Sequence, residues 1–259
     1  MTDMTPVTHE ELVDLVRRAP LSFSGTVTRI GGTSLAAVPV EARNDLTAVV
    51  RVDQVLHAPE AFRQLAGNEV TVQLAADAGP MAVGEAAAFF TRGMVYGEGL
   101  GVTEVARLPV GAVLGHISMA AASADELPFS SVQRTIRNED IAAHAAEADA
   151  VVVGTVTGLE DLGLADFSEH APHWWRAGVN VSIVERGAVE PGPAAFVYPS
   201  STDIRWRQVP NPNAGQEAVW LLHSTEGSHL AAYAPFRLLH HDDVQPVQKL
   251  AVLSGTEVS

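Results

Sequence analysis

The chain has 259 residues, of which 47% are hydrophobic, so it can bury the core of one large domain or of two small ones. Acidic residues outnumber basic ones by 31 to 16, and the resulting net charge of −15 argues against binding to phosphate backbones or to anionic membranes. The sequence has no cysteine, which excludes disulfides, thiolate metal sites and a cysteine nucleophile. We therefore expect no nucleic-acid partner and no membrane partner.

The first residues are polar and acidic, whereas a secretory signal needs positive charge followed by an apolar run. No apolar stretch reaches the length that spans a bilayer. The simplest interpretation is a soluble, cytoplasmic protein.

A short helix is predicted over residues 8–18, "THEELVDLVRR". Thr8 and Glu11 have the spacing of a capping box, and Leu12 and Val16 lie on one apolar face. Strands are predicted after this helix around "GTVT" at 25–28, at the alternating Val50 and Val52, and at 68–74, 84–93 and 100–108. Residues 108–137 then form a connector rich in small residues and serine.

The same pattern occurs again 129 positions later, where "GTVT" at Gly25 returns at Gly154. Without a gap, this offset also places Val50 and Val52 on Val179 and Val181. The second copy begins with a predicted helix, "NEDIAAHAAEAD", in which Asn138 is the N-cap and Ile141, Ala142 and Ala145 face inward. Its strands are predicted within 148–161, at the alternating Val179, Val181 and Ile183, and at 194–199, 215–224 and 230–239.

These elements predict a mainly β fold, a duplicated small five-stranded OB-like barrel in which each copy is preceded by a short α-helix. The predicted domains are residues 1–124 and residues 125–259. The repeated glycine either marks a bend of the first strand or lets a neighbouring side chain approach the backbone.

The run "DAVVVGTVTGLED", then "VNVSIVERGAVEPG" and "NAGQEAVWLLHS", resembles the OB-fold barrels of the netrin-like group, which includes the tissue inhibitors of metalloproteinases. The resemblance covers most of residues 138–245 and, more faintly, residues 8–110. It implies a binding scaffold. The inhibitor branch places an amino-terminal cysteine on its target's zinc, and since this chain has no cysteine, no inhibitory residue carries over.

Common catalytic motifs are not found. The Gly-rich run at 31–34 has no following lysine, no serine lies in a G-x-S-x-G elbow, and Lys249 is the single lysine of the chain. We therefore expect no catalytic residue and no cofactor.

Histidines form two clusters that offer an alternative, metal-based function. One pairs His170 with His173, and the other joins His240 and His241 to the two aspartates that follow them. Both clusters have the sequence of solvated loops, which favours ordinary surface histidines. His223, inside a predicted strand, is interpreted as a hydrogen-bonded structural residue.

The two copies differ most between their third and fourth strands, where the second copy carries a longer loop rich in Arg and Trp. Arg and Trp are enriched at binding hot spots. Two of the candidates for partner binding follow the first strand of the second copy, and four lie in this longer loop: Trp174 and Trp175, then Asp203, Arg205, Trp206 and Arg207. The alternative is that the tryptophans belong to the core and the arginines simply face water.

The leading hypothesis is a non-enzymatic protein-interaction or assembly module that binds a protein partner, either as an oligomer or within a larger complex. The alternative is a metal-dependent enzyme, or a small-ligand or carbohydrate binder, with its site between the barrels.

Overall fold

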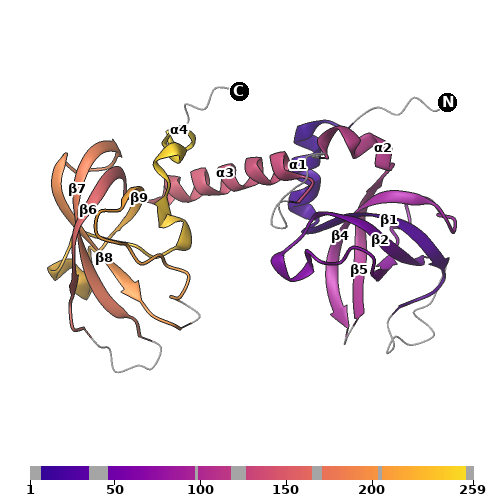
Figure 1. The fold of residues 1–259 in the computed structure, drawn as a ribbon, viewed down its shortest axis with the longest axis horizontal. Coiled ribbons are helices and arrows are strands. Elements are labelled where there is room, and N and C mark those ends of the chain that lie inside the picture. The colour runs from indigo at the N-terminus through magenta and orange to yellow at the C-terminus, as the bar shows by residue number, and fades with distance from the viewer. Residues whose placement is uncertain are drawn as a thin grey trace. The chain divides into compact units, whose positions relative to one another are not determined.

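The computed structural model describes residues 7–34, 46–96, 99–117, 127–164, 171–203 and 206–254. Its contacts divide the chain into two units, Met1–Arg137 and Asn138–Ser259, each with its own barrel (Figure 1). This division falls inside helix α3 (Ser130–Glu147), later in the chain than the predicted boundary after residue 124.

The first unit is a closed five-stranded barrel. Its elements are α1 (His9–Arg18), β1 (Leu21–Ile30), β2 (Thr47–His57), η2 (Glu60–Phe62), β3 (Glu69–Gln73), β4 (Ala86–Tyr96), β5 (Gly99–Leu108), α2 (Val110–Val113) and η3 (Leu114–His116). The strand order around the barrel is β1-β2-β3-β5-β4, in which β3 and β5 are parallel and the other pairs antiparallel.

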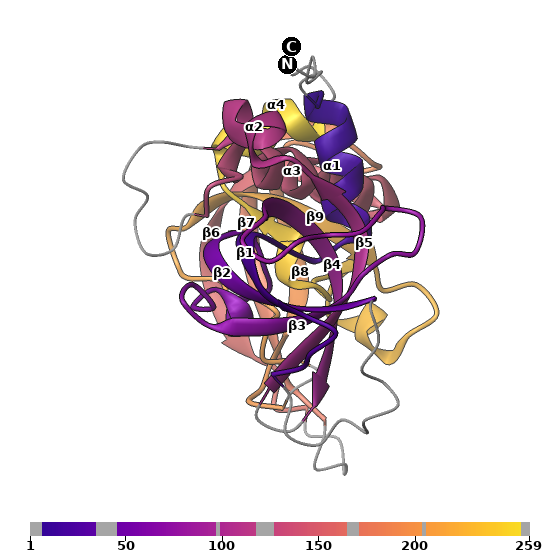
Figure 2. The same cartoon turned by 90° about the vertical axis from the view of Figure 1, so that its right-hand side faces the viewer.

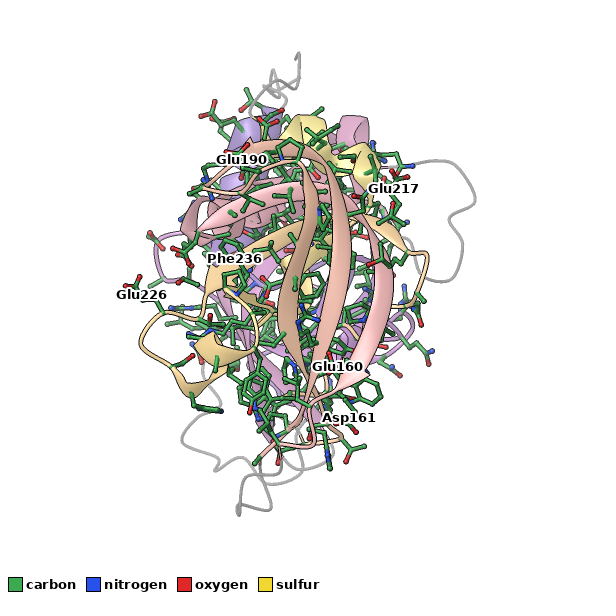
Figure 3. All side chains as sticks on the ribbon, turned by 90° about the vertical axis from the view of Figure 1, so that its left-hand side faces the viewer. Glu160, Asp161, Glu190, Glu217, Glu226 and Phe236 are labelled. Atoms are coloured by element: carbon green, nitrogen blue, oxygen red, sulfur yellow. The ribbon has the colours of Figure 1, made fainter. Side chains whose placement is uncertain are left out.

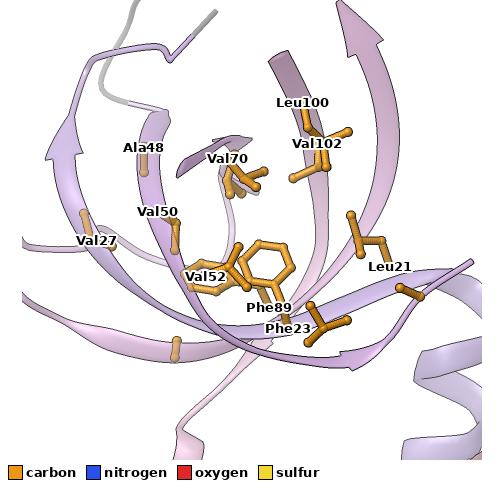
Figure 4. Close-up of a cluster of buried hydrophobic side chains, with 14 of the residues drawn as sticks. Leu21, Phe23, Val27, Ala48, Val50, Val52, Val70, Phe89, Leu100 and Val102 are labelled. Carbon is orange, nitrogen blue, oxygen red and sulfur yellow. The ribbon is translucent and has the colours of Figure 1, made fainter. Parts of the chain in front are cut away.

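Side chains from all five strands fill this barrel (Figure 4). Because strand side chains alternate between the two faces, Val50 and Val52 of β2 point inward together with Val70 of β3. Phe23 and Phe89 stack in the middle with their ring centroids 5.5 Å apart.

Helices cover one side of the first barrel, where Figures 1 and 2 show α1 beside α2. The predicted capping box of α1 is present: the Glu11 N–H donates to Thr8 Oγ1 (3.2 Å), and the Thr8 N–H donates to Glu11 Oε2 (2.8 Å). Leu12 and Val16 are buried in a cluster with Phe90 of β4, as the apolar face of the helix predicts.

The second unit repeats the barrel with a shortened fifth strand. Its elements after α3 are β6 (Ala150–Asp161), β7 (His173–Arg186), β8 (Gly192–Ser200), β9 (Glu217–Ser224), η4 (His229–Ala232), β10 (Phe236–Arg237), η5 (His241–Asp243), β11 (Val244–Gln245), η6 (Val247–Lys249) and α4 (Leu250–Leu253). Because β10 pairs with both β8 and β9, the strands close in the order β6-β7-β8-β10-β9, the order of the first barrel. The mainly β, duplicated OB-like fold is confirmed.

Two sequence-based expectations for the second unit need correction. The strand predicted at 230–239 begins in the short helix η4 (His229–Ala232), and only Phe236–Arg237 pair as a strand. Helix α3 begins at Ser130, so Asn138 lies inside the helix and is not its N-cap. The helix begins earlier than predicted because apolar residues near its start pack in the same buried cluster as Leu12 and Val16 of α1. These residues are Phe129, Val132 and Ile136.

Both explanations of the repeated glycine apply. The register of the first strand shifts between Ser24 and Gly25 and again between Val153 and Gly154. A Cβ atom at Gly25 would lie 2.6 Å from Val50 Cγ1, and one at Gly154 would lie 2.8 Å from Val179 Cγ2. Glycine therefore sits where the strand is irregular and where the next strand approaches too closely for any side chain.

Within the described ranges, no helix combines the length and the apolar character that crossing a membrane requires.

Candidate functional site

The loop between β8 and β9 is folded onto the end of the second barrel. Its residues 204 and 205 lie outside the described part of the chain, so the candidate Arg205 is not placed. The backbone N–H groups of Trp206 and Arg207 both donate to the carbonyl oxygen of Asp203, at 3.0 and 2.8 Å, which forms a tight turn. Arg207 is exposed at this turn and Trp206 is half-buried.

The two tryptophans of β7 contribute to packing. Trp174, only 7% exposed, lies on the outer face of β7 among residues that include Leu230, and its ring meets that of Trp206 edge to face with centroids 5.9 Å apart. Trp175, on the opposite face of the strand, packs against the barrel core. The structure thus brings Trp174, Trp206 and the Asp203 turn together, with Arg207 exposed beside them.

A polar hollow of about 480 Å³ lies beside this turn. Its lining includes exposed His173 at the start of β7, Ser200 and Ser201 at the end of β8, and Asn211 of the β8–β9 loop. The predicted partner of His173, His170, lies outside the described residues.

A second group of polar side chains joins helix α3, strand β9 and helix η5. This histidine–aspartate cluster consists of His144, His223 and Asp243, whose ligand atoms all lie within 4.8 Å of one another. Nε2 of His144 is 2.7 Å from Asp243 Oδ1, and Nε2 of His223 is 3.0 Å from the same oxygen. The Asp243 side chain is completely buried. Its other oxygen accepts the backbone N–H groups of Leu239 and His240 at 2.5 and 2.7 Å.

The predicted cluster at 240–243 is therefore divided. Asp243 turns inward to His144 and His223, whereas Asp242 stays with its neighbours, with Nε2 of His241 3.2 Å from Asp242 Oδ2. The imidazole ring of His240 lies between these groups, with its centroid 4.5 Å from that of His144 and 4.0 Å from that of His241.

The cluster holds a charged carboxylate. Burial favours the neutral form of Asp243, but hydrogen bonds from His223, Leu239, His144 and His240 outweigh it and hold the pKa below the usual value of an aspartate. The hydrogen bond to Asp243 raises the pKa of His223 above its usual value. Burial, followed by the nearby His241 and His144, lowers the pKa of His240.

His144 is the member of the cluster that sequence reasoning missed, although its position carried a signal. It lies three residues after Ile141 and one before Ala145, on the side of α3 that is buried. His223 follows Val219 and Leu221 at a spacing of two, which places it on the outer face of β9 where those residues pack with Ala145 of α3. The two periodicities indicate the face on which each histidine lies, but the contact between the faces depends on the tertiary fold.

Fold and site together define a chain of two OB-like barrels, with a folded loop and a histidine–aspartate cluster on the second. The sequence matches no protein-family model, and no curated protein matches it. A solved structure of a murine DNA-binding protein bound to double-stranded DNA matches over 84% of this chain and 92% of its own, with 11% identity and a TM-score of 0.20.

The match to a DNA-bound protein does not agree with the expectation that this chain has no nucleic-acid partner, and that expectation is withdrawn. Net charge describes the whole chain and does not exclude a local basic surface. A likeness this slight, however, carries no argument about what the chain binds.

Proposed function

We propose that this chain is a non-enzymatic protein-interaction module, a component of a larger cytoplasmic complex, and that it binds its partner at the end of the second barrel that carries the β8–β9 loop. The observation that carries the proposal is the folded turn from Asp203 to Arg207 beside the polar hollow. A loop held by backbone hydrogen bonds and by the contact between Trp174 and Trp206 loses little conformational entropy on binding.

The first barrel offers a comparison within the same chain. Its β3–β4 connection spans 74–85, whereas the β8–β9 connection spans 201–216 and is longer. The two barrels share one strand order and so form a common scaffold. The longer loop is what distinguishes the second copy, and a tandem arrangement can add avidity when both barrels engage one assembly.

The surface charge favours a basic surface on the partner protein. Figure 3 shows Glu160 and Asp161 together at the end of β6, and both are exposed. In the pairing of β6 with β7, Asp161 lies opposite Trp175. Trp175 is two residues after His173, which lines the hollow. With a chain charge of −15, these carboxylates would speed the approach of a basic partner, while Arg207 and Trp206 supply the residue types that dominate binding energy.

The carbohydrate-binding alternative gains no support from Trp174, because a sugar platform needs an exposed aromatic face and this ring is buried.

The proposal is tested with the partner that the wild-type chain captures from native extract, once that partner has been identified and purified. Titration calorimetry then compares the wild type with Arg207→Ala, Glu160→Lys and the control Glu226→Lys, which makes the same charge change on another margin of the barrel (Figure 3). We expect both test variants to weaken binding at least about tenfold and the control to leave it within about twofold. Equal affinity in all four proteins would overturn the proposal.

A further inference from the structure

We propose that the second barrel binds one divalent first-row transition ion, such as Zn²⁺, through Nε2 of His144, Nε2 of His223 and Oδ1 of Asp243. This inference is independent of the proposed partner surface, because it rests on different residues and a different face of the barrel.

Two of the separations between the three donor atoms come close to those of a metal site, and all three atoms lie within 4.8 Å of one another. Bonds of about 2.1 Å to a tetrahedral ion place neighbouring donors about 3.3–3.4 Å apart. The two imidazole nitrogens lie 2.7 and 3.0 Å from Asp243 Oδ1, so the carboxylate and the rings must separate by only a few tenths of an ångström to admit the ion.

The surroundings fix the carboxylate for this role. Asp243 Oδ2 is held by two backbone N–H groups, so only Oδ1 faces the imidazoles and the ligand is monodentate. Second-shell hydrogen bonds of this kind orient ligands in metal proteins. The ion would remain accessible, because the side chains of His144 and His223 are 18% and 15% exposed while that of Asp243 is fully buried.

The donor set identifies the class of ion. Two imidazole nitrogens and one carboxylate oxygen suit Zn²⁺, Ni²⁺ or Cu²⁺, whereas Ca²⁺ and Mg²⁺ prefer oxygen alone. Three protein ligands leave one tetrahedral position for water or for a group from a partner.

The ligands come from three segments far apart in sequence, so the ion would link them. His144 belongs to α3, His223 to the end of β9 and Asp243 to η5, which leads into β11 where Val244 pairs with Trp220 of β9. Since the ion would bind the folded chain, its binding should raise the melting temperature of the second barrel.

The test uses tag-free full-length protein, because an affinity tag of histidines would itself bind the ion. Equilibrium dialysis with Zn²⁺ and the visible spectrum with Co²⁺ compare the wild type with His144→Gln, His223→Gln and Asp243→Asn. The control is His229→Gln, an exposed histidine outside the cluster. Circular dichroism of each metal-free variant checks that it has folded.

We expect one ion per chain in the wild type and in the His229 variant, with intense tetrahedral Co²⁺ bands, and affinity at least about 100-fold weaker in the three cluster variants. Asp243→Asn keeps the shape of the side chain, so a folded variant that has lost the ion would support the proposal even if a histidine variant does not fold. No stoichiometric binding by the wild type would overturn it, and the contacts would then be a metal-free hydrogen-bonded cluster. Undiminished binding in the folded cluster variants would overturn it as well.

Discussion

Replacing Gly154 by alanine tests the account of the repeated strand irregularity. The added Cβ would lie 2.8 Å from Val179 Cγ2 and 2.9 Å from the carbonyl oxygen of Asn180, and that oxygen belongs to a strand that cannot easily move. Overpacking of this kind costs about 1–3 kcal/mol, and the lower entropy of the unfolded chain returns about 0.4–1 kcal/mol. We expect the variant to lose about 1–2 kcal/mol of the free energy of unfolding.

Tryptophan fluorescence during urea denaturation measures this loss, because all four tryptophans (Trp174, Trp175, Trp206 and Trp220) lie in the second unit. With a denaturant slope of roughly 2 kcal/mol per molar, the midpoint should fall by roughly 0.5–1 M.

Gly158→Ala is the matched control on the same strand, since a Cβ there meets nothing within 4 Å. Its midpoint should stay the same or rise. If Gly154→Ala and Gly158→Ala had equal midpoints, the close approach of β7 would not be the reason for the glycine.

Three further outcomes follow from the contacts of the two barrels. Trp220→Phe removes the indole N–H that donates to the Gly154 carbonyl at 2.8 Å and should cost about 1–3 kcal/mol in the same fluorescence assay. Thr8→Ala removes the N-cap of α1 and should cost about 1 kcal/mol, measured by circular dichroism during thermal and urea unfolding. Burial, with Arg63 nearby, lowers the pKa of His57 below its ordinary 6.5, so the unfolded chain binds the proton more tightly and the free energy of unfolding should fall as the pH is lowered through 6.5. His57→Gln should show a smaller fall between pH 7.5 and 5.5, and an identical fall would show that this histidine is not responsible.

The barrel strands could be predicted because the alternation of apolar and polar residues that indicates a strand lies within a few neighbouring positions. Alternation at Val50 and Val52, and the same alternation at Val179 and Val181, indicates which face of each strand is buried. The offset between the copies predicted a duplicated barrel, which the shared strand order of the two units confirms.

The remaining features depend on contacts between distant segments. Helix α3 begins before Asn138 because Phe129 and Val132 pack within the first unit, and sequence alone did not show that packing. Strand β10 is only two residues long, and its pairing with β8 and β9 depends on the path of the preceding loop.

The candidate site could likewise be predicted only in part from the sequence. Composition identified the Arg/Trp loop, but the burial of Trp174 depends on Leu230 and Ala234, which lie in a different loop. Likewise, the cluster around Asp243 joins residues 99 positions apart, and no local spacing indicates such a pair.

The most direct test of the central claim is the dissociation constant of the purified partner measured with Glu160→Lys and with Glu226→Lys. We expect the first substitution to weaken binding at least about tenfold and to reduce its dependence on salt, and the second to leave the constant within about twofold of the wild type. Equal constants for the two variants would contradict the claim that this end of the second barrel is the binding surface.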